Sequence, residues 1–240
     1  MKQKVSLFLF LCLNVLFPFS GISSFPGDLL VTPDPTPVVT EAESGVAGSG
    51  ISTLQDGSIR YITAKSNYTG QSGPGDSIRL ITYAVNFRDT GYYQLFVRMR
   101  VGAGGYDDDS FFTARGFGAK ALADGNDWVF INGMAGAGFT QPSDFVEALG
   151  EAGSQVWKWV NISLNFFPSS TALKTFYVDS GHLTQTFQIA TREDGLAIDK
   201  LAFGKADLYY TVEALDNGLA GVEAKPEPIP PYQEIGRAHV

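Results

Sequence analysis

From Val38 onward, apolar residues recur at every second position in a series of short runs. In one clear run, Ile81, Tyr83 and Val85 alternate with their neighbours. Successive side chains of a β-strand point to opposite faces, so a period of two predicts strands with one buried face. We count roughly nine or ten such runs, separated by turn-forming residues. This pattern predicts an all-β fold, an antiparallel β-sandwich or jelly roll.

Helical signal is almost absent from the same region. The only helix-like stretch, residues 142–150, is too short to change the fold class. The chain has 240 residues, which permits one sizeable domain with its own core plus tails.

Residues 1–23 have the pattern of a secretory signal peptide. Lys2 and Lys4 precede an apolar stretch, residues 5–17, and small residues follow it. That apolar stretch is too short to span a membrane. Its cleavage would remove Cys12, the only cysteine, and leave a mature chain without disulfides. We therefore expect a secreted protein that is extracellular, attached to a cell surface or periplasmic, and not inserted in a membrane.

The segments that flank the predicted domain, residues 38–205, have different compositions. Residues 24–37 are rich in Pro, Ser and Gly and predict a spacer. Residues 206–233 are interpreted as a connector followed by a Pro-rich linker, although 206–219 could still cover the sandwich. The last seven residues, 234–240, match one reading frame of a common sequencing adapter, and we interpret them as an assembly artefact. Because such linkers join domains, we expect covalently linked domains to follow.

Net charge narrows the classes of partner. The chain has 17 Lys and Arg residues against 25 Asp and Glu residues, a formal charge of −8. Loss of the signal peptide makes the charge more negative still. An acidic secreted chain without basic clusters argues against nucleic acid and anionic membranes as partners, and it is compatible with neutral sugars and divalent cations.

Three carboxylates predict a metal site. Glu41 and Glu43 lie two residues apart and share one face of a strand. Asp199 has the same parity as Leu201 and Phe203, so we expect its carboxylate on the side that those two residues bury. A buried carboxylate must be paired, hydrogen-bonded or metal-bound. Because no His or Cys lies beside these acids, we predict one structural Ca²⁺ ion, held by oxygen ligands.

These residues also carry a resemblance to a known family. The E-A-E of residues 41–43 and the I-D-x-L-x-F of residues 198–203 resemble carbohydrate-binding modules of families 6 and 35. The R-E-D-G of residues 192–195 and the W-x-W of residues 157–159 resemble related modules of secreted polysaccharide-degrading enzymes. The resemblance covers residues 38–205. It implies a galactose-binding-like sandwich whose partner is a polysaccharide or oligosaccharide.

Two tryptophans are candidates for stacking on a sugar ring. Trp157 and Trp159 share one face of a predicted strand, whereas Val160 and Ile162 lie on the opposite, more apolar face. A pyranose ring has apolar C–H faces, for which a flat aromatic ring is a suitable partner. We therefore expect both tryptophans to point away from the core. The alternative is that the loop at residues 133–155 folds over them.

Two loops supply further candidate sugar contacts. We predict contacts from five loop residues: Tyr106, Asp108, Arg192, Glu193 and Asp194. The acidic run at 107–109 has an alternative interpretation as a solvated turn, and Asp109 begins a D-S-F-F strand that resembles a structural feature of these modules. Family 6 modules place a sugar-contacting Asn in the second loop. This chain has none there, so the resemblance does not transfer that contact.

Catalytic motifs are absent from the sequence. It contains no G-x-S-x-G, H-E-x-x-H or P-loop pattern, and His182 is interpreted as a structural turn residue. Glu193 and Asp194 form the best acidic pair, but adjacent residues of a tight loop rarely face one cleft. We therefore predict a non-catalytic carbohydrate-binding module that targets a larger protein to polysaccharide. The alternative is a non-binding spacer domain of a surface protein or glycoside hydrolase, which buried aromatic residues would favour.

Overall fold

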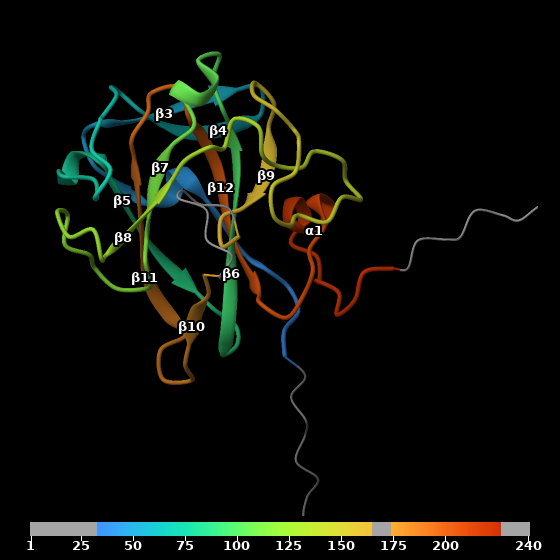
Figure 1. Ribbon diagram of the computed structural model, residues 1–240. Coiled ribbons are helices and arrows are strands. Elements are labelled where there is room, and N and C mark those ends of the chain that lie inside the picture. The colour runs from blue at the N-terminus through green and yellow to red at the C-terminus, as the bar shows by residue number, and fades with distance from the viewer. Residues whose placement is uncertain (1–32, 165–173, 227–240) are drawn as a thin grey trace, which may run out of the picture. The chain divides into compact units, whose positions relative to one another are not determined.

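The computed structural model describes residues 33–164 and 174–226. The predicted signal peptide at 1–23, most of the predicted spacer at 24–37 and the tail at 234–240 lie outside these residues. Within the described residues the chain forms two antiparallel sheets and almost no helix (Figure 1). The predicted all-β sandwich is therefore confirmed. In the same part of the chain, no helix is both long enough and apolar enough to cross a membrane.

The larger sheet has seven strands. Its order is β10-β6-β12-β4-β3, with β1 paired to β12 and β9 paired to β6. Its strands are β1 Val38–Glu41, β3 Ile51–Asp56, β4 Ile59–Ala64, β6 Gly91–Arg100, β9 Lys158–Asn161, β10 Phe176–Val178 and β12 Ala197–Lys205. The two longest of them, β6 and β12, pair over most of their length and form the centre of the sheet.

The smaller sheet has five strands in the order β2-β5-β11-β7-β8. Its strands are β2 Val46–Ala47, β5 Leu80–Asn86, β7 Phe111–Ala114, β8 Trp128–Ile131 and β11 Thr184–Thr191. Short 3-10 turns lie between strands at Ala42–Ser44, Ser77–Arg79 and Gly105–Asp107. The pairing of β11 with β5 runs from Thr184 opposite Asn86 to Ala190 opposite Leu80.

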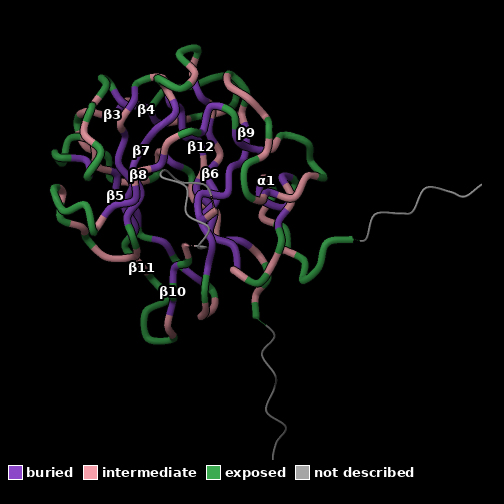
Figure 2. The backbone as a smooth tube through the Cα atoms, viewed as in Figure 1, coloured by how far each residue is buried: buried purple, intermediate pink, exposed green. Residues whose placement is uncertain are grey.

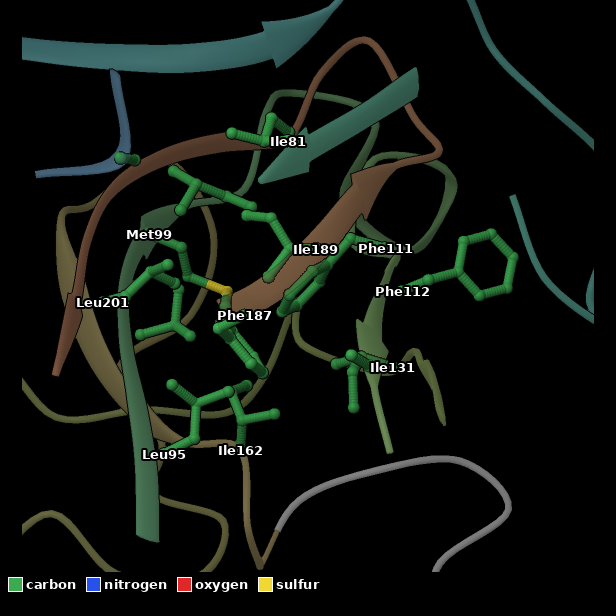
Figure 3. Packing of buried hydrophobic residues seen from close by; sticks show 14 of the residues in the cluster. Ile81, Leu95, Met99, Phe111, Phe112, Ile131, Ile162, Phe187, Ile189 and Leu201 are labelled. Atoms are coloured by element: carbon green, nitrogen blue, oxygen red, sulfur yellow. The ribbon is translucent and has the colours of Figure 1, made fainter. Parts of the chain in front are cut away.

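The main core fills the space between the two sheets. Leu95 and Met99 of β6 meet Phe187 and Ile189 of β11 there, as Figure 3 shows. The alternation predicted for β5 is confirmed, since every second residue from Ile81 is buried in this core. Buried segments accordingly run along both sheets, and exposed segments are found mainly in the loops (Figure 2).

A second core covers part of the outer face of the larger sheet. It consists of Phe96, Val146, Trp159, Ala202, Tyr210, Val212, Ala214 and Leu215. Three of these belong to α1, Val212–Asn217, which Figure 1 shows beside the sheet. Thr211 caps the start of this helix, because its Oγ1 accepts a hydrogen bond from the Ala214 N–H at 3.1 Å. Gly218 ends it with a left-handed φ of 64°.

The helix-like stretch at 142–150 is not helical. Phe145 forms an isolated β-bridge with Thr211, and Gly150 forms another with Gly138. Leu149 has a φ of 65°, which an α-helix excludes. This segment pairs with more distant parts of the chain, since the Val146 N–H also donates to the Tyr210 carbonyl. Short apolar stretches of this kind are too weakly helical to resist such competition.

A buried lysine holds the long loop that joins β8 to β9. Lys158 is 1 % exposed, and its Nζ donates to the carbonyls of Met134 at 2.6 Å, Ala135 at 3.2 Å and Gly153 at 2.7 Å. Asp109, which is fully buried, accepts a hydrogen bond from the Ala135 N–H at 2.9 Å. The ammonium and the carboxylate together provide partners for backbone groups that the loop would otherwise leave unsatisfied.

Candidate functional site

The outer face of the larger sheet carries an aromatic and charged cluster beside β9. We call Asp56, Tyr61, Arg98, Arg100 and Trp157 the Trp157 cluster. The Tyr61 ring packs edge-on to the Trp157 ring at 5.5 Å between centroids. The Arg100 guanidinium lies 4.9 Å from that ring, and the Arg98 guanidinium lies 5.8 Å from it. The Trp157 Nε1 donates a hydrogen bond to the Asp56 Oδ2 at 3.2 Å.

Strand alternation explains how these side chains meet. Val97 and Met99 are buried in the main core, so Arg98 and Arg100 project from the opposite face of β6. The tight turn between β3 and β4 places Asp56 where it forms an ion pair with Arg100. The cluster is therefore built from β3, β4, β6 and the residue before β9. Sequence reasoning identified Trp157 alone, although the parity of the two arginines was visible in the β6 pattern.

Trp159 is placed differently from Trp157. It is 1 % exposed within the second core, and its Nε1 donates to the Asp216 Oδ1 at 2.8 Å. Loop residue Phe139 and helix α1 pack around this core. Of the two alternatives for Trp159, the structure shows the covered one, and the ring has no face free for a sugar. Trp157 is half-buried.

Asp199 lies on the outer face of the sheet, contrary to its parity. A β-bulge between Ile198 and Lys200 breaks the alternation of β12 at this residue. Its Oδ2 accepts a hydrogen bond from Arg98 Nη1 at 2.5 Å, and the Asp199 side chain is 3 % exposed. Burial raises the pKa of this carboxyl group, and the Arg98 guanidinium opposes that rise. The ion pair therefore satisfies the buried carboxylate without a metal ion.

The other two predicted calcium ligands face cations as well. Glu41 lies 3.6 Å from Lys200 Nζ, and Glu43 lies 3.8 Å from Arg60 Nε. Both acids line one hollow of about 460 Å³ together with Asp199. The Glu43 Oε2 is buried and makes no hydrogen bond there. As they stand, no three acidic, His or Cys groups of the described residues converge as metal ligands, and the calcium prediction stays a prediction.

Two of the predicted loop contacts are engaged inside the protein. Arg192 donates to the Gly70 carbonyl at 3.1 Å and to Ser110 Oγ at 2.5 Å, and it pairs with Glu193. Glu193 is 8 % exposed, and its Oε2 accepts from the Ser110 N–H at 2.7 Å. Burial raises the pKa of the Glu193 carboxyl group. These two side chains join the loop between β11 and β12 to the start of β7.

The remaining predicted contacts lie on two neighbouring loops. The Asp108 carboxylate packs against Gly102 and Gly195 so closely that a Cβ on Gly195 would meet it at 2.0 Å. Its Oδ2 accepts from the Gly104 N–H at 2.7 Å, so Asp108 shapes its own turn. Tyr106 is 73 % exposed on this loop, and Asp194 is exposed on the neighbouring one. The Trp157 cluster is made from other elements.

Sequence reasoning missed an exposed aromatic pair on the same sheet. Tyr92 of β6 and Tyr177 of β10 are 58 % and 56 % exposed, and their ring centroids lie 4.9 Å apart. Tyr92 precedes the buried Tyr93 and is therefore out of phase with the core positions of β6. That phase was a usable signal for Tyr92. Nothing in the sequence predicted Tyr177 as its cross-strand partner.

Comparisons with known proteins give structural neighbours only. No family model and no curated protein matches the chain. Among solved structures, it is similar to an Arthrobacter globiformis T6 isomalto-dextranase complexed with panose, with a TM-score of 0.40 and 15 % identity over 72 % of this chain and 24 % of that one. It is also similar to a Podospora anserina GH26-CBM35 β-(1,4)-mannanase, with a TM-score of 0.40 and 15 % identity over 71 % of this chain and 28 % of that one. The chain thus spans about a quarter of the length of either neighbour.

Proposed function

We propose that the chain carries a non-catalytic carbohydrate-binding domain of a secreted protein, and that the Trp157 cluster contacts the glycan. The observation that carries this proposal is a half-buried tryptophan on the outer face of the sheet, with hydrogen-bonding groups beside its ring. Trp157 offers an apolar surface to the C–H face of a sugar ring. Asp56 and Arg100, beside that ring, offer an acceptor and a donor for hydroxyl groups.

The charges of the cluster favour an uncharged ligand. Arg100 is paired with Asp56, and Arg98 is paired with Asp199. Little unbalanced positive charge remains to attract an acidic polysaccharide, and the whole chain is acidic. A neutral polysaccharide or oligosaccharide fits this balance.

Binding without cleavage is supported by the state of the buried acids. Asp109, Glu193 and Asp199 each accept hydrogen bonds from groups of the protein itself. A glycosidase needs two carboxyl groups that flank the scissile bond from one cleft. These three acids serve loops and strands instead, so we assign them no catalytic role.

Calcium remains part of the proposal for the first strand and its neighbours. The Glu43 Oε2 supports this part of the proposal, because it is a buried oxygen without a hydrogen bond that could serve as a metal ligand. Glu41 has a side chain that is 52 % exposed, so it would have to turn inward to join Glu43 and Asp199 around an ion. An ion bound in this way would add a link between the segment at 41–43 and β12.

A spacer domain is the second candidate function. The observation that favours it is the burial of Trp159. Its ring packs inside the second core and is not accessible to a ligand. Under this alternative the contacts within the Trp157 cluster would only stabilise the outer face of the sheet. Loss of glycan binding on mutation of Trp157 separates the two functions.

The test is retention of the domain on insoluble polysaccharides. We expect Trp157→Ala to weaken binding by roughly an order of magnitude, because one stacking ring contributes about 1 kcal/mol beyond the area that it buries. Trp157→Tyr keeps a ring and should restore part of the retention. Thermal unfolding checks that each variant is folded. A folded Trp157→Ala protein that is retained like the wild type would refute the proposed site, and Tyr106→Ala tests the loop end separately.

A further inference from the structure

A second aromatic surface lies away from the Trp157 cluster. Tyr92 and Tyr177 are direct cross-strand partners in the pairing of β6 with β10. Their rings are tilted at 46° to each other and are both more than half exposed. Phe176 and Val178 on either side of Tyr177 are buried in the main core, so the two tyrosines project from the outer face of the sheet. Two large apolar rings are therefore held side by side at the surface, on rigid strands.

A groove begins at this tyrosine pair. A hollow of about 630 Å³ lies beside Tyr92 and is also lined by Thr90 and Asp207. A second hollow of about 380 Å³ shares Asp207 with the first and extends to Gln94 and Tyr209. Tyr209 is 41 % exposed and supplies a third ring. The two hollows together present aromatic rings, Thr90 and the Asp207 carboxylate, whereas the Gln94 amide is buried and hydrogen-bonded within the protein.

The charges along this groove are nearly all neutralised. Lys205 Nζ lies 3.1 Å from the Asp89 carboxylate and also donates to the Thr90 carbonyl. At the far end, Lys225 is paired with Glu147. Asp207 forms no ion pair with any described residue and is exposed. A single free carboxylate repels polyanions and can accept hydrogen bonds from hydroxyl groups.

We propose that the tyrosine pair and this groove form a second carbohydrate-binding site that takes an uncharged polysaccharide chain. The proposal rests on the function proposed above for its class of ligand, but it uses different residues. Sugar rings stack on Tyr92 and Tyr177, and their hydroxyl groups bond to the exposed Asp207. The rings and the uncharged polar groups match the apolar faces and hydroxyl edges of a neutral sugar.

The two sites share one sheet face but cannot merge into one platform. Tyr92 and Arg98 lie six positions apart on β6, which corresponds to about 20 Å along the strand. Between them, Phe96 is covered by the second core. A glycan chain therefore cannot lie flat along β6 from one site to the other. Each site binds its own stretch of polysaccharide, and the pair gains avidity on substrates that offer many stretches.

Affinity electrophoresis through gels that contain polysaccharide tests this inference. The neutral probes are dextran, galactomannan, xyloglucan and mixed-linkage glucan, and polygalacturonate is the charged comparator. We expect at least one neutral probe to retard the wild type, and polygalacturonate to leave it unretarded. The double variant Tyr92→Ala/Tyr177→Ala should bind the neutral probe roughly tenfold more weakly, because two stacking contacts are lost. The matched control Tyr92→Phe/Tyr177→Phe keeps both rings and should migrate like the wild type.

The outcomes separate the two sites. If no neutral probe retards the wild type, the proposed function fails, and this inference fails with it. If Trp157→Ala weakens retardation and the double Ala variant does not, the tyrosine site alone is refuted. Sedimentation equilibrium tests whether the two tyrosines form a dimer interface instead of a glycan site. A wild type that dimerises, and a double Ala variant that is monomeric with unchanged glycan binding, would show that the tyrosines contact a second copy of the chain.

Discussion

At the scale of residues, Arg98 and Asp199 form an ion pair whose two side chains differ in exposure. The Asp199 side chain is 3 % exposed, and its Arg98 partner is 21 % exposed. The Asp216 carboxylate lies 3.5 Å from the same guanidinium and would still neutralise part of its charge if Asp199 were replaced. Because Asp199 is buried, loss of the ion pair should lower the stability of the domain. Because Arg98 is partly exposed, water screens part of the electrostatic energy of the pair.

Asp199→Asn should destabilise the domain. We expect the free energy of unfolding in urea to fall by about 2 kcal/mol, because the Arg98 guanidinium loses its buried partner. Glu41→Gln is the matched control, since the Glu41 side chain is 52 % exposed in its pair with Lys200 and that pair should contribute less than about 1 kcal/mol. Equal effects of the two substitutions would contradict the importance of burial.

Lys158 predicts a pH dependence of stability. Burial lowers the pKa of its ammonium group from 10.5 to about 8, and the nearby Asp109 opposes this shift. Between these two pH values the unfolded chain therefore holds more protons at Lys158 than the folded chain. The contribution of this group to the free energy of unfolding should accordingly rise as pH increases from about 8 to 10.5.

Urea denaturation of the wild type and of Lys158→Met across this range measures that contribution. The substitution leaves the carbonyls of Met134 and Gly153 without their donor, so we expect a loss of several kcal/mol at pH 7. The advantage of the wild type should then grow above pH 8. A difference that shrinks with pH would show that Lys158 titrates in the opposite sense.

At the scale of elements, the bulge in β12 determines which face of the sheet carries the Asp199 carboxylate, and so which groups lie beside Glu41 and Glu43. Without the bulge, Asp199 would share the buried side of Leu201 and Phe203. With it, the carboxylate turns toward Arg98 and faces the same hollow as Glu41 and Glu43. The junction of β1, its 3-10 turn and β12 is therefore held by cations of the protein itself.

Calcium binding at this junction is tested by thermal unfolding. If an ion joins Glu41, Glu43 and Asp199, the melting temperature should rise between excess chelator and millimolar calcium, because the ion binds only the folded state. Glu43→Gln should remove this rise. An unchanged melting temperature in the wild type would show that Arg60, Arg98 and Lys200 suffice to neutralise the acids.

At the scale of the whole domain, the second core organises the outer face of the larger sheet. It separates the Trp157 cluster from the tyrosine pair and covers Trp159. Its residue Tyr210 also reaches the start of the described chain, since the Tyr210 hydroxyl donates to the Pro35 carbonyl at 3.1 Å, and the Gly221 N–H donates to the same carbonyl at 2.9 Å. Residues around Pro35 and Gly221 therefore lie side by side.

The sequence by itself determined the class of the fold and much of the core. Alternation is a local property, because the backbone of a strand turns each side chain to the opposite face of its neighbour. It therefore predicted β5 and β6, and it placed Trp157 and Trp159 together on the face away from the main core. It could not predict that a helix at 212–217 would cover one of those rings.

Only the tertiary structure decided which of the predicted residues meet. The bulge at Asp199, the partner of each charged side chain and the pairing of Tyr92 with Tyr177 depend on strand register between segments far apart in the chain. Register is set by the hydrophobic patterns of both paired strands and by the geometry of the turns, so the residues next to one position do not determine it alone. The sequence therefore identified the acids and the tryptophans, and the fold decided that the acids face cations and that Trp159 is buried while Trp157 is of intermediate exposure.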